Sequence, residues 1–344
     1  MQENEITEQE ELFEHHRIVV DKGQTALRID KFLHNRIENT SRNKIQAAAD
    51  AGSILVNSQP VKSNYKVKPG DVITIVLSHP PRLVELYPDP IPLNIVYEDA
   101  HLIIVDKPAG MVVHPAYGNY RNTLVNALVH HFHPHLEGKP LSSESLRPGL
   151  VHRIDKNTSG LLVIAKDEYT MTHLAKQFYD RTISRNYYAL VWGDIKEAHG
   201  TITGNIGRNI ADRKIMDVFA DGAHGKHAVT HYDVTERFGY VTLVKCKLET
   251  GRTHQIRVHF KYIKHPLFND NEYGGDRILK GTVFTKYRQF VENCFELLPR
   301  QALHAASLGF IHPVSKQQLF FESPLPADMH TVIEKWRAYT AVNS

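Results

Sequence analysis

Cysteine is scarce in this 344-residue sequence, and no hydrophobic run is long enough to cross a membrane. The two cysteines, Cys246 and Cys294, are too few for a disulfide framework, so we expect both thiols to fill the core in a reducing compartment. No apolar stretch approaches the roughly 18–20 residues of a membrane-spanning helix. The first residues also lack the basic start and apolar centre of a secretory signal. These absences predict a cytoplasmic protein with no membrane partner.

Motifs for cofactors and metals are missing as well. No GxxxxGK[ST] or GxGxxG loop occurs, so we expect no nucleotide cofactor. The 22 histidines suggest a metal site, but His254 and His259 are five residues apart, whereas zinc-binding helices space histidines four apart with an acid between them. Ser159 is not part of a GxSxG motif, which disfavours a serine hydrolase. The sequence therefore predicts neither a metal nor a cofactor.

Charge is unevenly distributed along the chain. Residues 1–16 contain six glutamates and no lysine or arginine, which is typical of a disordered, solvated tail. Without these six glutamates, the net charge changes from +3 to +9. A basic body indicates a polyanionic partner such as nucleic acid.

Residues 17–80 are predicted to form a small module of two helices and short antiparallel strands. Apolar residues recur at helical spacing over 27–37, and Ser41 is expected to cap a second helix that ends at Gly52. Apolar and polar residues alternate around turn residues over 53–77, which favours short strands. Five prolines between 80 and 92 predict a linker and a domain boundary near residues 80–90.

Residues 90–337 are predicted to form a larger α+β domain. The segment 102–115 has the pattern of a strand, a turn and a second strand, and 169–183 that of a helix with Met171, Leu174 and Phe178 on one stripe. Strands follow strands without regular βαβ alternation, which favours a mixed, largely antiparallel sheet flanked by helices.

One carboxylate stands out in the segment "LVHRIDKNTSGLLVIAKD", residues 150–167. Asp155 lies between Arg153 and Lys156, just before a predicted buried strand. The neighbouring cations favour the charged form of the acid, whereas a general acid needs an apolar pocket and a raised pKa. The neighbours therefore suit a nucleophilic or electrostatic role, and a surface ion pair beside a turn is the more common alternative.

A second candidate group lies in "LETGRTHQIRVHF", residues 248–260. We expect a strand to end at Gly251 and Thr253 to cap a helix. Helical spacing gives this helix a buried pair, Ile256 and Phe260, and a separate polar set, His254, Arg257 and Lys261. Arg257 is thus free to bind a carboxylate or phosphate through two hydrogen bonds, and a solvated helix face is the alternative.

The strand "SRNYYALVW", residues 184–192, carries a tyrosine on each face. Alternation places Tyr187, Ala189 and Val191 on one face, with Tyr188 and Leu190 on the other. One tyrosine per face is typical of core packing, but a tyrosine that faces a pocket can stack on a nucleic-acid base.

Several of these blocks resemble a known family. "GLVHRIDKNTSGLLVIAKD" is similar to the signature of the ribosomal large-subunit pseudouridine synthases of the RluA/RluD type. The family's other blocks are matched in the same order by "IIVDKPAGMVVHP", "ISRNYYALVWG", "GKHAVTHY", "LETGRTHQIRVH", "HPLFNDNEYGG" and "ALHAASLGFIHP". Residues 17–78 resemble the RNA-binding module of the S-four type of small-subunit ribosomal protein. Asn269 departs from the pattern, which usually has Gly there, and we expect it only to adjust a loop.

The resemblance implies an isomerase that converts uridine to pseudouridine in RNA without any cofactor. It implies that Asp155 is the catalytic aspartate, that Tyr187 stacks on the target base and that Arg257 pairs with Asp155. Arg153 would enter the RNA helix where the base has left the stack. The other expected RNA contacts are Arg252 and His254, together with Arg28, Lys31, Arg42 and Lys44 of the N-terminal module. Similarity to the RluD branch implies 23S ribosomal RNA as the partner and a monomeric enzyme.

Three other functions are considered. The chain could modify another ribosomal RNA site or a tRNA, or it could bind RNA during ribosome assembly without catalysis. A nucleoside glycosidase that uses Asp155 would release free uracil, but glycosidases usually need two carboxylates. No second acid lies in a comparable context. Within the synthase reaction, attack on the ribose, attack on the base and removal of a ribose proton are all open to Asp155.

Overall fold

The fold is described from a computed structural model of the chain. It describes residues 13–343 except 38–39, 78–85, 116–118, 137–140, 142–147, 213–214 and 282–283. The chain divides into two compact units, Met1–Val84 and Glu85–Ser344, called here the N-terminal and C-terminal units. Each unit is described by itself.

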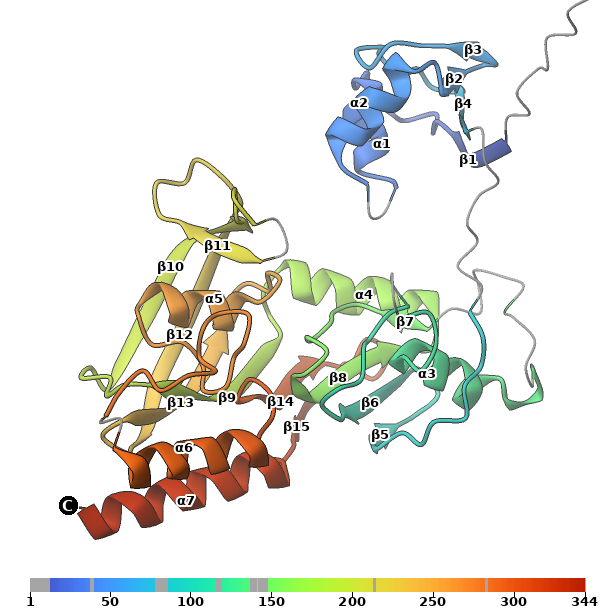
Figure 1. Cartoon of the computed structure of the whole chain (residues 1–344). Coiled ribbons are helices and arrows are strands. Elements are labelled where there is room, and N and C mark those ends of the chain that lie inside the picture. Colours follow the sequence, from blue (N-terminus) through green and yellow to red (C-terminus); the bar gives the residue numbers. More distant parts are fainter. Residues whose placement is uncertain are drawn as a thin grey trace, which may run out of the picture. The chain divides into compact units, whose positions relative to one another are not determined.

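The N-terminal unit combines two helices with a four-stranded antiparallel sheet of order β1-β4-β2-β3 (Figure 1). Its elements are β1 (Phe13–Val19), α1 (Ile29–His34), α2 (Arg42–Asp50), β2 (Ile54–Val56), β3 (Gln59–Pro60) and β4 (Val72–Leu77). Ser41 caps α2 as predicted, because its Oγ accepts a hydrogen bond from the amide of Lys44 at 3.3 Å. Gly52 follows the C-cap with a φ of 73°, a conformation that glycine adopts without strain.

Strand β1 begins four residues before the predicted start of this module. Residues 13–16, which the charge pattern assigned to the acidic tail, belong to a strand that pairs with β4, with Ile18 opposite Ile73. The pairing uses backbone groups, so the glutamate at position 14 does not prevent it. The predicted disorder of residues 1–12 lies outside the described residues.

The C-terminal unit is built on one eleven-stranded sheet. Its central order is β11-β10-β12-β13-β9-β14-β8-β6-β5, with β15 on β14 and β7 on β8. All pairs are antiparallel except β14 with β8. The mixed, largely antiparallel sheet flanked by helices confirms the predicted fold class. The strands are β5 (Ile95–Glu98), β6 (Leu102–Lys107), β7 (Gly149–Leu150), β8 (Ser159–Ala165), β9 (Ser184–Trp192), β10 (His199–Arg208), β11 (Met216–Phe219), β12 (Lys226–Arg237), β13 (Val241–Leu248), β14 (Leu303–Ile311) and β15 (Gln318–Glu322).

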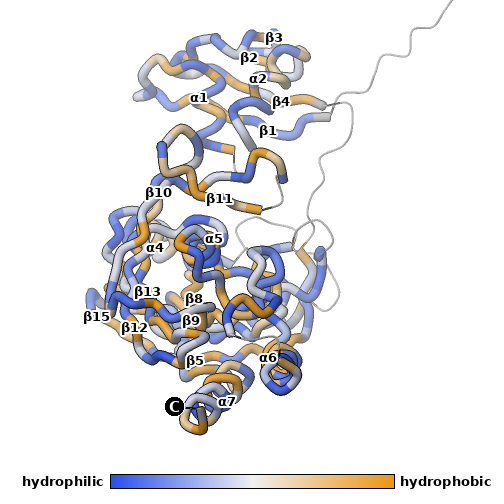
Figure 2. The backbone as a smooth tube through the Cα atoms, turned by 60° about the vertical axis from the view of Figure 1, so that its left-hand side comes forward, coloured by the Kyte–Doolittle hydropathy of each residue, from blue (hydrophilic) through white to orange (hydrophobic). Residues whose placement is uncertain are grey.

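Helices cover this sheet. They are α3 (Leu124–Phe132), the short 3-10 helix Pro134–Leu136, α4 (Glu168–Tyr179), α5 (Gln255–Tyr262), α6 (Thr285–Leu297) and α7 (Ala327–Asn343). Helices α6 and α7 lie side by side (Figure 1). Helix α7 carries both hydrophobic and hydrophilic residues (Figure 2), and its buried residues Met329, Val332, Ile333 and Trp336 pack in one hydrophobic cluster.

Strand β9 separates two hydrophobic clusters, as its alternation predicted. Tyr187, Ala189 and Val191 belong to a cluster that includes residues of α3 and α5. Leu190 belongs to the other cluster, with residues of α6 and α7. Both cysteines are buried, one in each cluster, and neither forms a disulfide. The site described below therefore rests on a strand that is packed on both faces.

Some local predictions were wrong. Residues 111–114 do not form a second strand. The buried amino group of Lys107 binds the carbonyls of Pro108 and Met111 at 2.7 and 2.9 Å, so the chain bends around this side chain. Met171 is 37% exposed, so the apolar stripe of α4 is not buried along its whole length. Strand β13 ends at Leu248, three residues before the predicted end at Gly251. Helix α7 continues past residue 337, the predicted end of the domain.

Thr253 does not cap α5. The N-cap is His254, whose φ of 55° is in the left-handed region and whose side chain makes no capping hydrogen bond. The carboxamide oxygen of Gln255 instead accepts hydrogen bonds from the amide of Arg252 at 3.0 Å and the hydroxyl of Thr250 at 2.8 Å. These bonds close a tight turn, and within it the backbone of His254 adopts the strained left-handed conformation.

Candidate active site

The loop that carries Asp155 connects β7 to β8, and two buried basic side chains bind its backbone. Lys107 of β6 donates a hydrogen bond to the carbonyl of Lys156 at 3.0 Å. Arg300, which precedes β14, donates to the carbonyl of Asn157 at 3.0 Å. Burial lowers the pKa of Lys107 to about 7, against the influence of Asp155. The loop backbone is thus fixed by distant parts of the sheet, and its acidic side chain is left free of these bonds.

Asp155 is only partly surrounded. Its side chain is 20% exposed, and its Oδ2 lies 3.3 Å from Nη1 of Arg257. Its Oδ1 lies 3.9 Å from Nε2 of His254, which is too far for a hydrogen bond. Both partners come from α5 and its N-cap, so one helix presents them together. The carboxylate keeps free acceptor positions toward the cleft, which a substrate can use.

Arg257 is buried among carboxylates. Its side chain is 4% exposed, and Asp270 receives two of its hydrogen bonds, at 2.7 and 2.8 Å. Glu272 receives another at 2.5 Å. Burial opposes the charge of the guanidinium, but the hydrogen bonds and charge of Asp270, with help from Asp155 and Glu272, raise the pKa of Arg257. The cation is therefore permanent, and its orientation is set by Asp270.

Asn269, where the sequence departs from the family pattern, anchors the loop that carries Asp270. Asn269 has a φ of 56°, which glycine adopts readily and asparagine tolerates. Its Nδ2 donates hydrogen bonds to the carbonyls of Phe295 at 3.1 Å and Leu298 at 2.6 Å, at the end of α6. The asparagine therefore keeps the loop conformation and adds a tie to α6.

Tyr187 both packs in the core and borders the cleft. It is 7% exposed, belongs to the hydrophobic cluster of α3 and α5, and lines the same cavity as Asp155. Burial raises the pKa of its hydroxyl, so the side chain is neutral at physiological pH. The two interpretations of this tyrosine are compatible, because the side chain packs in the core and also lines the cleft.

These residues surround one cleft of about 340 Å³, which lies within the range of small-ligand sites. Its walls come from the loop before β8, from α4, from β9, and from the turn before α5. The lining residues are Val151, His152, Arg153, Ile154, Asp155, Thr158, Phe178, Tyr179, Arg185, Tyr187, Leu248, Gly251, Arg252, Thr253, His254, Gln255, Ile256 and Leu303.

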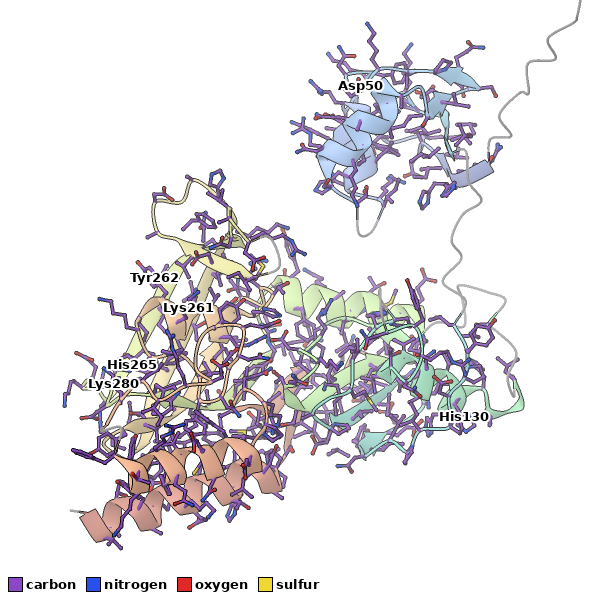
Figure 3. All side chains as sticks on the ribbon, in the orientation of Figure 1. Asp50, His130, Lys261, Tyr262, His265 and Lys280 are labelled. Atoms are coloured by element: carbon purple, nitrogen blue, oxygen red, sulfur yellow. The ribbon has the colours of Figure 1, made fainter. Side chains whose placement is uncertain are left out.

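Three of the predicted RNA contacts line the cleft. Arg153 is exposed at its rim. Arg252 is half-buried, and its Nε donates to the carbonyl of His227 at 3.1 Å. Burial lowers the pKa of His254, whose Nδ1 lies 2.8 Å from the hydroxyl of Tyr273, so the ring is neutral at pH 7. Lys261, the third member of the polar set on α5, lies with Tyr262 at the other end of the helix (Figure 3).

The other four predicted RNA contacts lie in the N-terminal unit. Arg28 and Arg42 both pair with the buried carboxylate of Asp30, each at 3.0 Å. Lys31 and Lys44 are exposed. The two lysines are therefore the freer cations of this set.

Sequence reasoning missed the residues that support the site. Lys107 and Asp270 stand within the blocks that resemble the family, but nothing in their local sequence indicates burial of a charge. Arg185 and His152 flank the predicted site residues and were not singled out. In the part of the chain that the structure describes, no group of three or more histidine, cysteine or acidic side chains could hold a metal ion. None of the described helices is long and apolar enough to span a membrane.

Comparisons with known proteins place this geometry in context. Residues 101–262 match a family model described as RNA pseudouridylate synthase, and residues 27–73 match the S4 domain. An uncharacterized RNA pseudouridine synthase from Chlorobaculum parvum is 48% identical over 319 residues, covering 92% of this chain and 96% of that protein. A ribosomal large subunit pseudouridine synthase D from Zymomonas mobilis is 42% identical over 326 residues, with coverage of 92% and 96%.

A solved structure supports the fold. Human RNA pseudouridylate synthase domain containing 4 superimposes with a TM-score of 0.52 at 22% sequence identity, covering 71% of this chain and 93% of that one. At this identity the likeness concerns the fold alone.

Proposed function

Because this chain belongs to the RNA pseudouridylate synthase family, which confirms the resemblance seen in its sequence, we propose that it isomerises specific uridines of 23S ribosomal RNA through Asp155. The observation that carries the assignment is the incompletely paired carboxylate of Asp155, 3.3 Å from a buried arginine in a cleft of about 340 Å³. Relatives named ribosomal large subunit pseudouridine synthase D, from Zymomonas mobilis and Nitrosomonas europaea, support the choice of RNA.

The reaction exchanges one glycosidic bond for another. The bond between ribose C1′ and uracil N1 breaks, the base turns, and a bond forms between C1′ and C5. The hydrogen lost from C5 is balanced by one gained at N1, so no atom leaves the product. One carboxylate is enough for this chemistry, because the detached base is retained and no water has to be activated, unlike in glycoside hydrolysis.

Each residue of the site has a distinct task in this proposal. Asp155 is the catalytic group that meets the flipped-out uridine. Arg257 orients its carboxylate and places positive charge beside it, and Tyr187 stacks on the base from the rigid strand β9. Arg153 occupies the space that the base leaves in the RNA, and Arg252 and His254 contact the nucleotide at the turn before α5. The N-terminal unit adds affinity for RNA phosphates through its exposed lysines.

The test is pseudouridine formation by the purified full chain on 23S ribosomal RNA from cells that lack the gene. Asp155→Asn should abolish the product and leave RNA affinity nearly unchanged, while Asp276→Asn, an exposed acid that does not line the cleft, should behave as wild type. Release of free uracil would instead identify a glycosidase. Rescue of a ribosome-assembly defect by the Asp155→Asn chain would identify a non-catalytic role.

The remaining expectations concern partners and location. We propose that the protein acts as a monomer in the cytoplasm, and the ribosomal names of the relatives support the location. Sedimentation of the purified chain at micromolar concentration tests the first point, and a dimer would contradict it.

A further inference from the structure

A buried arginine and a partly buried histidine in the cleft wall carry N–H groups that no described residue accepts. Nε of Arg185 and Nδ1 of His152 are both buried without a hydrogen-bond partner in the described part of the chain. We propose that Arg185 and His152 form an oxyanion site that binds one of the two backbone phosphates flanking the target uridine. The identification of the bound anion as an RNA phosphate rests on the proposed function, whereas the anion site itself rests on the two unpaired donors.

Arg185 is a buried cation that forms no ion pair with any residue the structure describes. It lies on β9 two residues before Tyr187 and is 8% exposed. Its guanidinium carbon lies 5.1 Å from the centroid of the Phe178 ring, and its Nη1 packs against Gly251. Glu249, two residues before this glycine, pairs with Arg181 and His231 instead. A buried charge without a partner is costly, so its retention at a cleft indicates a ligand that supplies the missing charge.

His152 provides the second unpaired donor. Its Nε2 accepts a hydrogen bond from the amide of Val163 at 3.0 Å, so the proton of the neutral ring must be on Nδ1. Burial, reinforced by Arg185, lowers the pKa of His152 to about 3, and the ring is therefore neutral at pH 7. The ring stacks on Phe178 with centroids 4.6 Å apart. Phe178 thus packs against both His152 and Arg185 on one wall of the cleft.

A phosphate satisfies this site better than a uracil carbonyl does. Both ligands offer acceptor oxygens, but only the phosphate brings the negative charge that Arg185 lacks, and a guanidinium matches phosphate geometry with two hydrogen bonds. Other cations also border the cleft. Arg153 lies at its rim, and burial together with the charge of Arg181 lowers the pKa of Arg252. This crowding of positive charge favours an anion over a neutral ligand.

The first measurement separates this role from a structural one. Methionine at position 185 keeps a flexible side chain against Phe178 and removes the uncompensated charge. The melting temperature of the free full-length Arg185→Met chain should be equal to or above that of the wild type. A lower melting temperature would show that the arginine stabilises the fold and would overturn the proposal. Arg277→Met, at an exposed arginine outside the cleft lining, is the matched control.

The second measurement identifies the ligand atom. RNA fragments that contain the mapped target uridine are made with one neutral methylphosphonate, either 5′ or 3′ of that uridine. Binding is measured by filter retention in an Asp155→Asn background, which prevents turnover. With Arg185 present, one of the two substitutions should weaken binding by about tenfold or more, as expected for loss of a charge-assisted contact.

The Arg185→Met chain should bind the unmodified RNA with a similar loss, and the same methylphosphonate should then cause no further loss. Additive losses at both positions would overturn the phosphate assignment. Coupling to 4-thiouridine at the target, without coupling to either methylphosphonate, would assign the site to the base carbonyl and would also overturn it. Failure of the wild type to form pseudouridine would contradict the proposed function, but neither binding nor melting depends on that reaction.

Discussion

Two aspartates, one in each unit, meet arginines in opposite ways. Asp30 of α1 has no exposed side-chain surface and accepts hydrogen bonds from Arg28 and Arg42 at 3.0–3.1 Å and from Gln46 at 2.8 Å. Burial alone would raise the pKa of Asp30, but the hydrogen bonds from Arg28, Gln46 and Arg42 lower it. All of its acceptor capacity is used within the protein.

Asp155 is the opposite case. It has one guanidinium contact at 3.3 Å, and a fifth of its side chain is exposed in a cleft. The arginine that meets it, Arg257, donates its shorter hydrogen bonds to Asp270 and Glu272. The comparison shows that an Asp beside an Arg is structural when the carboxylate is saturated, and available for chemistry when the arginine is saturated by other partners. The pair seen in sequence does not distinguish these two cases.

The largest expected difference between the two aspartates is in catalysis. Asp155→Asn should lower the single-turnover rate of pseudouridine formation by about 10³-fold or more, as expected for a group that acts directly on the substrate. Asp30→Asn should change that rate far less at saturating enzyme, because Asp30 lies in the other unit. Rates are measured under single-turnover conditions on the same ribosomal RNA. Equal losses of rate in both variants would show that Asp155 has no special role in catalysis.

For stability we expect the opposite order, with a larger effect at Asp30 than at Asp155. Asp30→Ala should lower the free energy of unfolding of the N-terminal unit by about 2–4 kcal/mol, because it leaves two guanidinium groups without their buried partner. Asp155→Asn should change the stability of the C-terminal unit by less than about 1 kcal/mol. Urea unfolding followed by hydrogen exchange of each unit separates the two effects. A destabilised Asp155→Asn chain would mean that this carboxylate also holds the fold.

Acid should affect the N-terminal unit through Asp30. Its pKa is lower in the folded state than the value of about 4 in unfolded chains, so its stabilisation is complete above that value. The stabilisation is lost as the pH falls toward the lower folded pKa, where the native carboxylate becomes protonated. Unfolding of this unit, measured between pH 6 and pH 2 (about two units either side of the unfolded value), should show that decline. The Asp30→Asn chain should lack this part of the pH dependence.

The smallest expected effect concerns free cations near Asp30. Lys31→Ala and Lys44→Ala should each reduce the slope of log affinity against log salt by about 0.7–0.9, the contribution of one phosphate contact. Both lysines are exposed, so neither change should affect folding. Titration of ribosomal RNA at several salt concentrations measures the slope. Unchanged slopes would mean that this face of the unit does not contact phosphates.

The sequence predicted features that depend on local period and on motif. Alternation along β9 was enough to place Tyr187 and Leu190 in different clusters, because the side-chain period of a strand is two. The family motifs were enough to bring Asp155 and Arg257 together, although they are 102 residues apart.

The remaining features depend on contacts that no local pattern encodes. The turn before α5 is closed by Gln255, so its capping could not be inferred from the preference of Thr253 for N-caps. The unpaired Nε of Arg185 depends on how the side chain packs against Phe178, which comes from another element, and on the lack of an ion pair to Arg185 among the described residues. A sequence shows which side chains carry charge, but only the packed structure shows which of them lack a partner.

Asn269 links the end of a peripheral helix to Arg257, the arginine that contacts Asp155. Its amide group bonds the last carbonyls of α6, and the next residue along the chain orients Arg257. No residue of α6 lines the cleft, yet fraying of its final turn would release the loop that positions the guanidinium. On heating, activity should therefore disappear before the sheet melts, and the enzyme's working temperature would be set by a helix end remote from its substrate.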